Sequence, residues 1–217
     1  MRSGWRLAAL GSRARMGPAL VVSLGILAGC RTLPFPQPQL TGEYGLVLGK
    51  WTRSVALYSG LETRGFCRAV YLSPEFVDAQ AKKISEMRAE LPDEAQRTRE
   101  RLRAQAATPT VFAIFYTPDK QSNDWNEKDS VWRIALNQGL GQVEPQKIER
   151  YERPFNAEIR SLYPYLDDYS VAYLIHFPGQ SAPAGFTATE LQMVVAGALG
   201  KMDFKWNLLH PEKDKQQ

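Results

Sequence analysis

The stretch Tyr169-Ser170-Val171-Ala172-Tyr173-Leu174-Ile175-His176-Phe177 has the clearest β-strand pattern of the chain. Its odd-numbered residues are tyrosine, valine, tyrosine, isoleucine and phenylalanine, and serine, alanine, leucine and histidine alternate with them. Because successive side chains of a strand point to opposite faces of a sheet, this alternation predicts a strand with one strongly apolar face. Such a face has to be covered by a second layer, so the stretch predicts a layered domain.

Further strand patterns lie on both sides of this stretch. Residues 51–58 alternate between apolar and polar side chains, and residues 61–72 return after the turn signal Ser59-Gly60. Residues 111–116 are apolar on both faces, which is typical of a central strand. Shorter β-like stretches are expected at 44–48, at 130–136 and after the turn at 199–201.

Residues 188–200 fit two structures. Thr187-Ala188-Thr189-Glu190 matches a helix capping box, and the apolar residues that follow fit helical spacing. Adjacent Val194-Val195 favours a strand, and Gly197 and Gly200 weaken a helix. We therefore predict a strand in this segment.

A helical insertion is expected between residues 74 and 107. Ser73-Pro74-Glu75 supplies an N-cap, a proline at the first helical position and an early acidic residue. One apolar stripe follows at helical spacing: Val77, Ala81, Ile84, Met87 and Leu91. Pro92 then ends this helix, and a second segment begins that is dense in charge: Arg97, Arg99, Glu100, Arg101 and Arg103. We interpret the second segment as a solvated helix face rather than a site for an acidic ligand.

Together these patterns predict a mostly β fold of about eight or nine short strands. We expect a two-layer β-sandwich over residues 43–208, immunoglobulin-like or C2-like, with the helical insertion at 74–107. Residues 209–217 are expected to form a polar C-terminal tail.

The N-terminal 29 residues have the features of a signal peptide. Four arginines and no acidic residue precede an apolar run from Gly17 to Leu27, and small residues follow it. The sequence Leu27-Ala28-Gly29-Cys30 closely resembles the lipobox of bacterial lipoproteins. The resemblance implies cleavage before Cys30 and lipid attachment to its thiol. Two other interpretations are a membrane-spanning helix, for which the run is shorter than the roughly 20 residues required, and an ordinary secretory signal.

The same resemblance predicts where the protein is held. The implied location is the cell envelope, with the outer membrane as the expected site, because Arg31 is not the aspartate that resembles an inner-membrane retention signal. Residues 30–42 then form a lipidated, proline-rich tether, since Pro34, Pro36 and Pro38 favour an extended spacer. The membrane is therefore one expected partner.

The charge balance argues against a nucleic-acid partner. The chain has 27 basic and 23 acidic residues, and removal of the four arginines before Cys30 leaves the two signs equal. A nucleic-acid-binding protein would keep a basic excess.

The chain has one cysteine besides Cys30, namely Cys67. We interpret Cys67 as a small core residue rather than a reactive thiol.

We find no motif for catalysis, for a cofactor or for a metal. The two histidines, His176 and His210, lack metal-ligand spacing, and no nucleophile-elbow motif accompanies them. Asp167-Asp168 resembles a general acid–base pair, but adjacent residues entering a strand point to opposite faces. We therefore predict no catalytic residue, no cofactor and no metal.

The polar loop 119–129 offers two weaker candidates. Five of its side chains carry oxygen atoms of the kind that binds Ca²⁺: Asp119, Asn123, Asp124, Asn126 and Asp129. However, Lys120 and Lys128 lie among them, and the glycine and glutamate of an EF-hand are missing. We therefore interpret the loop as an ordinary connection between strands. Trp125 lies at the tip of this loop, where an exposed aromatic side chain is a possible partner contact, although it can also fold back onto the sandwich.

The sequence thus favours a lipid-anchored, non-enzymatic envelope protein. Its expected role is that of a structural or assembly accessory, or a protein-interaction module, with an envelope protein as partner. The first alternative is a binding module that holds an apolar or lipid ligand between the sheets. The second is a hydrolase with a site around His176.

The lipid anchor gives the first testable prediction. We expect Cys30→Ser to abolish acylation and to leave the precursor uncut or released from the membrane, because the thiol that carries the lipid is gone. Metabolic labelling with a fatty acid measures this directly. Label that remains on the Cys30→Ser protein would contradict the lipoprotein assignment.

Overall fold

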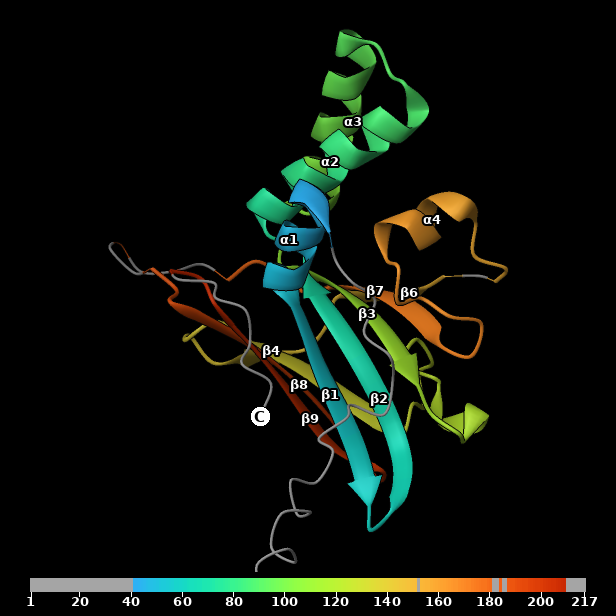
Figure 1. Ribbon diagram of the computed structural model, residues 1–217. Coiled ribbons are helices and arrows are strands. Elements are labelled where there is room, and N and C mark those ends of the chain that lie inside the picture. The colour runs from blue at the N-terminus through green and yellow to red at the C-terminus, as the bar shows by residue number, and fades with distance from the viewer. Residues whose placement is uncertain (1–40, 152, 181–183, 185–186, 210–217) are drawn as a thin grey trace, which may run out of the picture. The chain divides into compact units, whose positions relative to one another are not determined.

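The fold is built on two antiparallel sheets (Figure 1). The computed structural model describes residues 41–151, 153–180, 184 and 187–209. The larger sheet has the order β1-β2-β3-β7-β6: β1 Thr52–Ser59, β2 Glu62–Tyr71, β3 Thr110–Tyr116, β7 Val171–His176 and β6 Lys147–Arg150. The smaller sheet has the order β5-β4-β8-β9: β5 Gln142–Val143, β4 Trp132–Asn137, β8 Glu190–Gly197 and β9 Gly200–Asn207.

The central strands of the larger sheet are buried on both faces. Six of the seven residues of β3 are buried, as are five of the six in β7, and the two strands pair with Ala113 opposite Tyr173. The strong alternation predicted for 169–177 therefore becomes a strand whose less apolar face is covered as well. Tyr169 lies before the strand and is exposed.

The smaller sheet covers one face of the larger sheet. In β9, every second side chain is fully buried, namely Met202, Phe204 and Trp206, and the residues between them are exposed. Aromatic contacts join the two sheets: Phe115 of β3 meets Trp132 of β4 edge-on, with ring centroids 5.4 Å apart. This is the face-to-face packing of a β-sandwich.

Hydrogen bonds hold β9 beside the end of α1 and the start of β1, where the two sheets meet. The indole N–H of Trp206 donates to the carbonyl oxygen of Trp51 over 2.8 Å. Nε of the buried Arg53 donates to the carbonyl oxygen of Lys205 over 2.7 Å. These bonds cross 155 and 152 residues of sequence and fix the relative position of the two sheets.

Helices lie at one end of the larger sheet (Figure 1): α1 Gly42–Trp51, α2 Pro74–Arg88, α3 Pro92–Gln105 and α4 Ala157–Leu162. The predicted insertion is confirmed as the α2–α3 hairpin. The hydroxyl oxygen of Ser73 accepts a hydrogen bond from the backbone N–H of Phe76, and Pro74 and Pro92 begin their helices. A short 3₁₀ turn, η1, spans Lys120–Ser122.

The outer face of the larger sheet is covered by the segment that leads into and out of α4. Tyr163 stacks on Phe112 of β3 with ring centroids 4.1 Å apart, and Tyr151 meets the same ring edge-on. Tyr165 lies over the guanidinium of Arg68 in β2. The domain thus has a third layer beside the two sheets. The mostly β, two-sheet fold with a helical insertion is confirmed, and a closer likeness to immunoglobulin-like or C2-like sandwiches stays a prediction.

The predicted β-like stretch at 44–48 is wrong, because these residues lie in α1. Tyr44, Leu48 and Trp51 lie at helical spacing and face the core, and Glu43 and Lys50 have the charges that favour the two helix ends. The five-residue window was too short to show this period. The short elements β5, β6 and α4 were not predicted, because two to six residues carry too little periodicity.

Within residues 188–200, the stretch Glu190–Gly197 forms the strand β8, so a strand is confirmed there in place of a helix. Leu191, Met193 and Val195 of β8 are buried against the larger sheet, which is the period of a strand. The apolar stripe predicted for the first helix of the insertion is only partly buried. Its first part (Val77, Ala81 and Ile84) is in the core, whereas its end (Met87 and Leu91) is exposed.

The described residues belong to one compact unit with this core. Cys30, the signal peptide, nearly all of the tether and the tail beyond 209 lie outside the described residues. No helix among the described residues is long and apolar enough to cross a membrane. A unit with its own hydrophobic core is expected to fold alone, so residues 38–217 are the protein used in the measurements proposed below.

The contact between β8 and β4 gives a stability prediction. A Cβ at Gly197 would lie 2.5 Å from the carbonyl oxygen of Val131 and 2.9 Å from the Trp132 ring, so Gly197→Ala should destabilise the domain by about 1–3 kcal/mol. Gly179→Ala is the matched control, because a Cβ there meets nothing within 4 Å. Urea unfolding measures both. Equal stability of the two variants would contradict the close approach of the strands.

Candidate functional site

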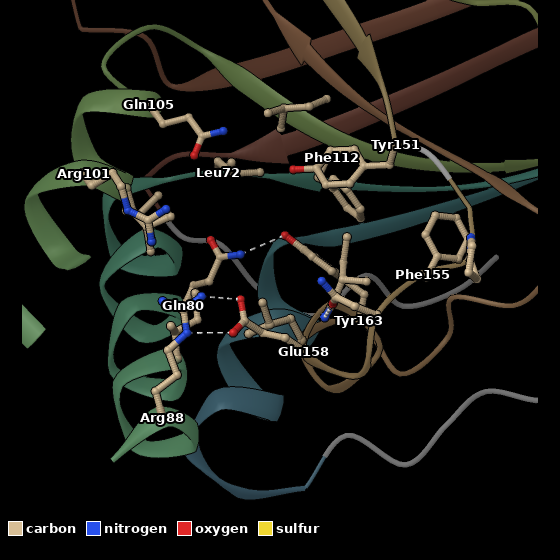
Figure 2. A pocket seen from close by; sticks show the side chains of 18 residues that line it. Leu72, Gln80, Arg88, Arg101, Gln105, Phe112, Tyr151, Phe155, Glu158 and Tyr163 are labelled. Atoms are coloured by element: carbon tan, nitrogen blue, oxygen red, sulfur yellow. Dashed lines mark hydrogen bonds and ion pairs between the residues drawn. The ribbon is translucent and has the colours of Figure 1, made fainter. Parts of the chain in front are cut away.

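A pocket of about 360 Å³ lies between the α2–α3 hairpin, α4 and the outer face of the larger sheet (Figure 2). This volume is within the range of small-molecule sites. Its floor is apolar: Phe112 of β3 and Leu174 of β7 pair in register, and Leu72 lies at the end of β2. Val77 and Ile84 of α2 and Ile159 and Leu162 of α4 continue this surface up the walls.

Polar side chains face one another above the floor. Gln80 of α2, with Arg101 and Gln105 of α3, lies on the helical side of the pocket, and Tyr151 lies on the sheet side (Figure 2). The amide N–H of Gln80 donates to the hydroxyl of Tyr163 over 3.3 Å. Within the described part of the chain, neither the Arg101 guanidinium nor the hydroxyl of Tyr151 has a hydrogen-bond or ion-pair partner. These groups are therefore available to a ligand.

An ion pair joins α2 to α4 beside the pocket. Nε and Nη2 of Arg88 donate to the two carboxylate oxygens of Glu158 over 2.8 and 2.9 Å (Figure 2). A bidentate pair of this kind fixes direction as well as distance. The pocket is therefore formed by elements that hold each other in place without a ligand.

The pocket tyrosines keep their protons at neutral pH. Burial raises the pKa of Tyr163 well above its ordinary value, and burial together with the nearby Glu149 carboxylate raises the pKa of Tyr151. Both hydroxyls therefore act as neutral donors or acceptors. Among the described residues that line this pocket, the one carboxylate is that of Glu158, which is paired with Arg88.

The prediction that Trp125 is an exposed partner contact is wrong. Only 2% of Trp125 is exposed, because its ring lies between Phe115 at 4.9 Å and Tyr173 at 5.1 Å, stacked on both. The loop returns onto the sandwich because Asn123 links the two strands below it, donating to the carbonyl oxygen of Phe115 and accepting from the Tyr173 hydroxyl.

The oxygens of loop 119–129 serve the loop itself. Asp119 accepts hydrogen bonds from the Ser122 hydroxyl and the Gln121 N–H, which lowers its pKa, and Asp124 accepts from the Ser130 hydroxyl and the Val131 N–H. In the part of the chain that the structure covers, no three His, Cys, Asp or Glu side chains come close enough to hold a metal ion. These hydrogen bonds cap the turns of the loop that connects β3 to β4.

His176 and the two aspartates do not come together. Nδ1 of His176 lies 3.2 Å from the Thr110 hydroxyl, and Nε2 lies 3.4 Å from a Glu149 oxygen, which binds it at the sheet edge. Asp167 accepts the backbone N–H groups of the turn before β7, and Asp168 pairs with Arg160. None of the three lines the pocket.

Cys67 lies in β2 as a buried free thiol, as interpreted from the sequence. It has no exposed surface, and burial raises its pKa. A thiol in this state is a poor nucleophile at neutral pH.

Sequence reasoning missed the residues around the pocket. Gln80 interrupts the buried face of α2, and a buried polar residue inside an apolar stripe was the one available signal. Arg101 could not be distinguished from its charged neighbours, because only the tertiary fold brings its helix against the sheet.

Comparisons with known proteins give no relative: no protein-family model matches the chain, and no curated protein or solved structure is significantly similar to it.

The burial of Trp125 gives the prediction of this section. Trp125→Ala should destabilise residues 38–217 by about 3–5 kcal/mol, because it leaves a cavity between two rings. Trp125→Phe should cost less than about 1.5 kcal/mol, because it keeps an aromatic ring and removes a buried indole N–H that has no partner. Urea unfolding measures both, with the exposed Tyr169→Ala as control. An unchanged stability of Trp125→Ala would contradict this placement.

Proposed function

We propose that this chain is a non-enzymatic binding protein of the cell envelope, held at the membrane by a lipid on Cys30. Its ligand is a small molecule with an apolar body. One observation carries the binding function: a formed pocket with an apolar floor and unpaired polar groups above it. A concave site that combines apolar surface with a few polar groups is a common form of ligand site.

The pocket supports the alternative of a ligand-binding module, but it does not lie between the two sheets, where the sequence analysis placed the ligand. The sequence suggested a ligand between the two sheets, but aromatic side chains fill that space: Phe115, Trp125, Trp132 and Tyr173 contact one another there. The pocket lies on the other face of the larger sheet, below the helical insertion. The insertion is thus a wall of the proposed binding site.

A role as an assembly accessory stays a prediction from the sequence. Exposed large apolar residues lie at separate ends of the described domain, with Tyr58 and Leu61 at the β1–β2 turn and Met87 and Leu91 near the α2–α3 turn (Figure 1). Scattered residues of this kind are common on soluble domains and point to no partner. The pocket is the more specific feature.

The binding function can be tested with phenyl-naphthylamine, an uncharged apolar probe whose fluorescence rises in apolar sites. We expect residues 38–217 to bind it and Ile159→Trp to weaken the binding by about tenfold or more, because the indole fills space at the α4 wall. Fluorescence titration gives both affinities.

Ser161→Trp is the matched control. Ser161 is exposed on the same helix and does not line the pocket, so the same added ring should leave probe binding unchanged. Circular dichroism shows that both variants are folded. No binding by the unmodified protein, or equal binding by all three proteins, would contradict the proposed site.

A further inference from the structure

Among the residues that the structure describes, the charged side chains that line the pocket do not balance. Arg88, Glu158 and Arg101 line it, and Arg88 and Glu158 neutralise each other through their bidentate pair. Arg101 remains, so the lining carries a net charge of one positive unit from these three residues. A ligand that enters this pocket meets a cation that has no carboxylate partner in the described chain.

Arg101 differs from the other arginines of α3. Arg103 makes two hydrogen bonds to Asp78, at 2.8 and 2.6 Å, and Arg99 lies 3.9 Å from the same carboxylate. Those contacts join α3 to α2 and agree with the solvated, paired face expected from the sequence. Arg101 lies instead on the side of α3 that borders the pocket.

Three neutral polar side chains line the pocket together with Arg101. Gln105 follows Arg101 by one helical turn, and in Figure 2 both side chains point from α3 toward the pocket. Gln80 lies beside them on α2, and the Tyr151 ring faces them from the sheet side (Figure 2). A guanidinium, two amides and a phenol suit a carboxylate, sulfonate or phosphate group, because all of them can donate hydrogen bonds.

We infer that the ligand is an amphipathic anion, with one oxyanion group at Arg101 and a compact apolar body on the floor of Phe112, Leu174 and Leu72. This inference rests on the proposed binding function and adds the chemical class of the ligand. Arg101 is exposed, so it selects the anion at the mouth of the pocket while the buried floor binds the apolar part.

The test compares two fluorescent probes that share one apolar body. Anilinonaphthalene sulfonate carries one negative charge, and phenyl-naphthylamine is its uncharged counterpart. We expect residues 38–217 to bind the anionic probe about fivefold more tightly, and Arg101→Gln to remove this preference. Arg97→Gln is the matched control, because it removes the same charge one turn earlier on α3, outside the pocket, and should keep both affinities.

Competition then separates the head group from the apolar body. Decanoate should displace the anionic probe, whereas acetate at the same concentration should not, because acetate has no apolar chain to cover the floor. Displacement by acetate would overturn the amphipathic assignment.

The outcomes also separate this inference from the proposed function. If neither probe binds, both are overturned. Equal affinity for the two probes, or the same loss in Arg97→Gln as in Arg101→Gln, would overturn the charge selection alone and leave an apolar binding pocket.

Discussion

Strands β3 and β7 are apolar on both faces, so the larger sheet is stable only when both of its faces are covered. The smaller sheet covers one face with a regular alternation of buried and exposed residues. The other face has no second sheet opposite it, and it is covered by pieces from three parts of the chain: α1, the α2–α3 hairpin and the segment that contains α4. The apolar sides of α2 and α4 are buried by this packing, whereas α3 packs mainly on α2.

Because separate helices and loops cover the outer face of the larger sheet, space remains where they do not contact one another. α2 rises from the end of β2, α3 returns beside it, and α4 approaches from the far side of β7 (Figure 1). Between them a pocket remains beside Phe112 and Leu174, and the rings of Tyr163 and Tyr151 pack on Phe112 at its edge. The Arg88–Glu158 pair and the Gln80–Tyr163 hydrogen bond span this gap, and such polar contacts fix a separation without filling it. The pocket is therefore a consequence of how the outer face is covered.

The sequence predicted the elements that have a long and regular pattern of apolar and polar residues or a clear helix cap. The alternation of 169–177, the two-faced apolar run of 111–116 and the capped start at Ser73-Pro74 all became the expected elements. The sequence-based prediction failed where the patterned stretch was short, as in α1, or where burial depends on contacts between distant parts of the chain. Trp125 is the clearest example: its polar neighbours predict an exposed tip, and only the pairing of β3 with β7 creates the two rings between which it stacks.

The candidate site also depends on contacts between residues that are far apart in the sequence. Its floor comes from β2, β3 and β7, and its walls come from α2, α3 and α4, so no local motif joins Gln80, Arg101 and Tyr151. The dense charge of a helix such as α3 predicts only that the helix is exposed to solvent. The fold divides its arginines, since Arg103 and Arg99 meet Asp78 of α2 and hold the hairpin together, whereas Arg101 is left at the pocket without a counter-charge in the described chain. One helix thus both closes the insertion and supplies the cation of the proposed binding site.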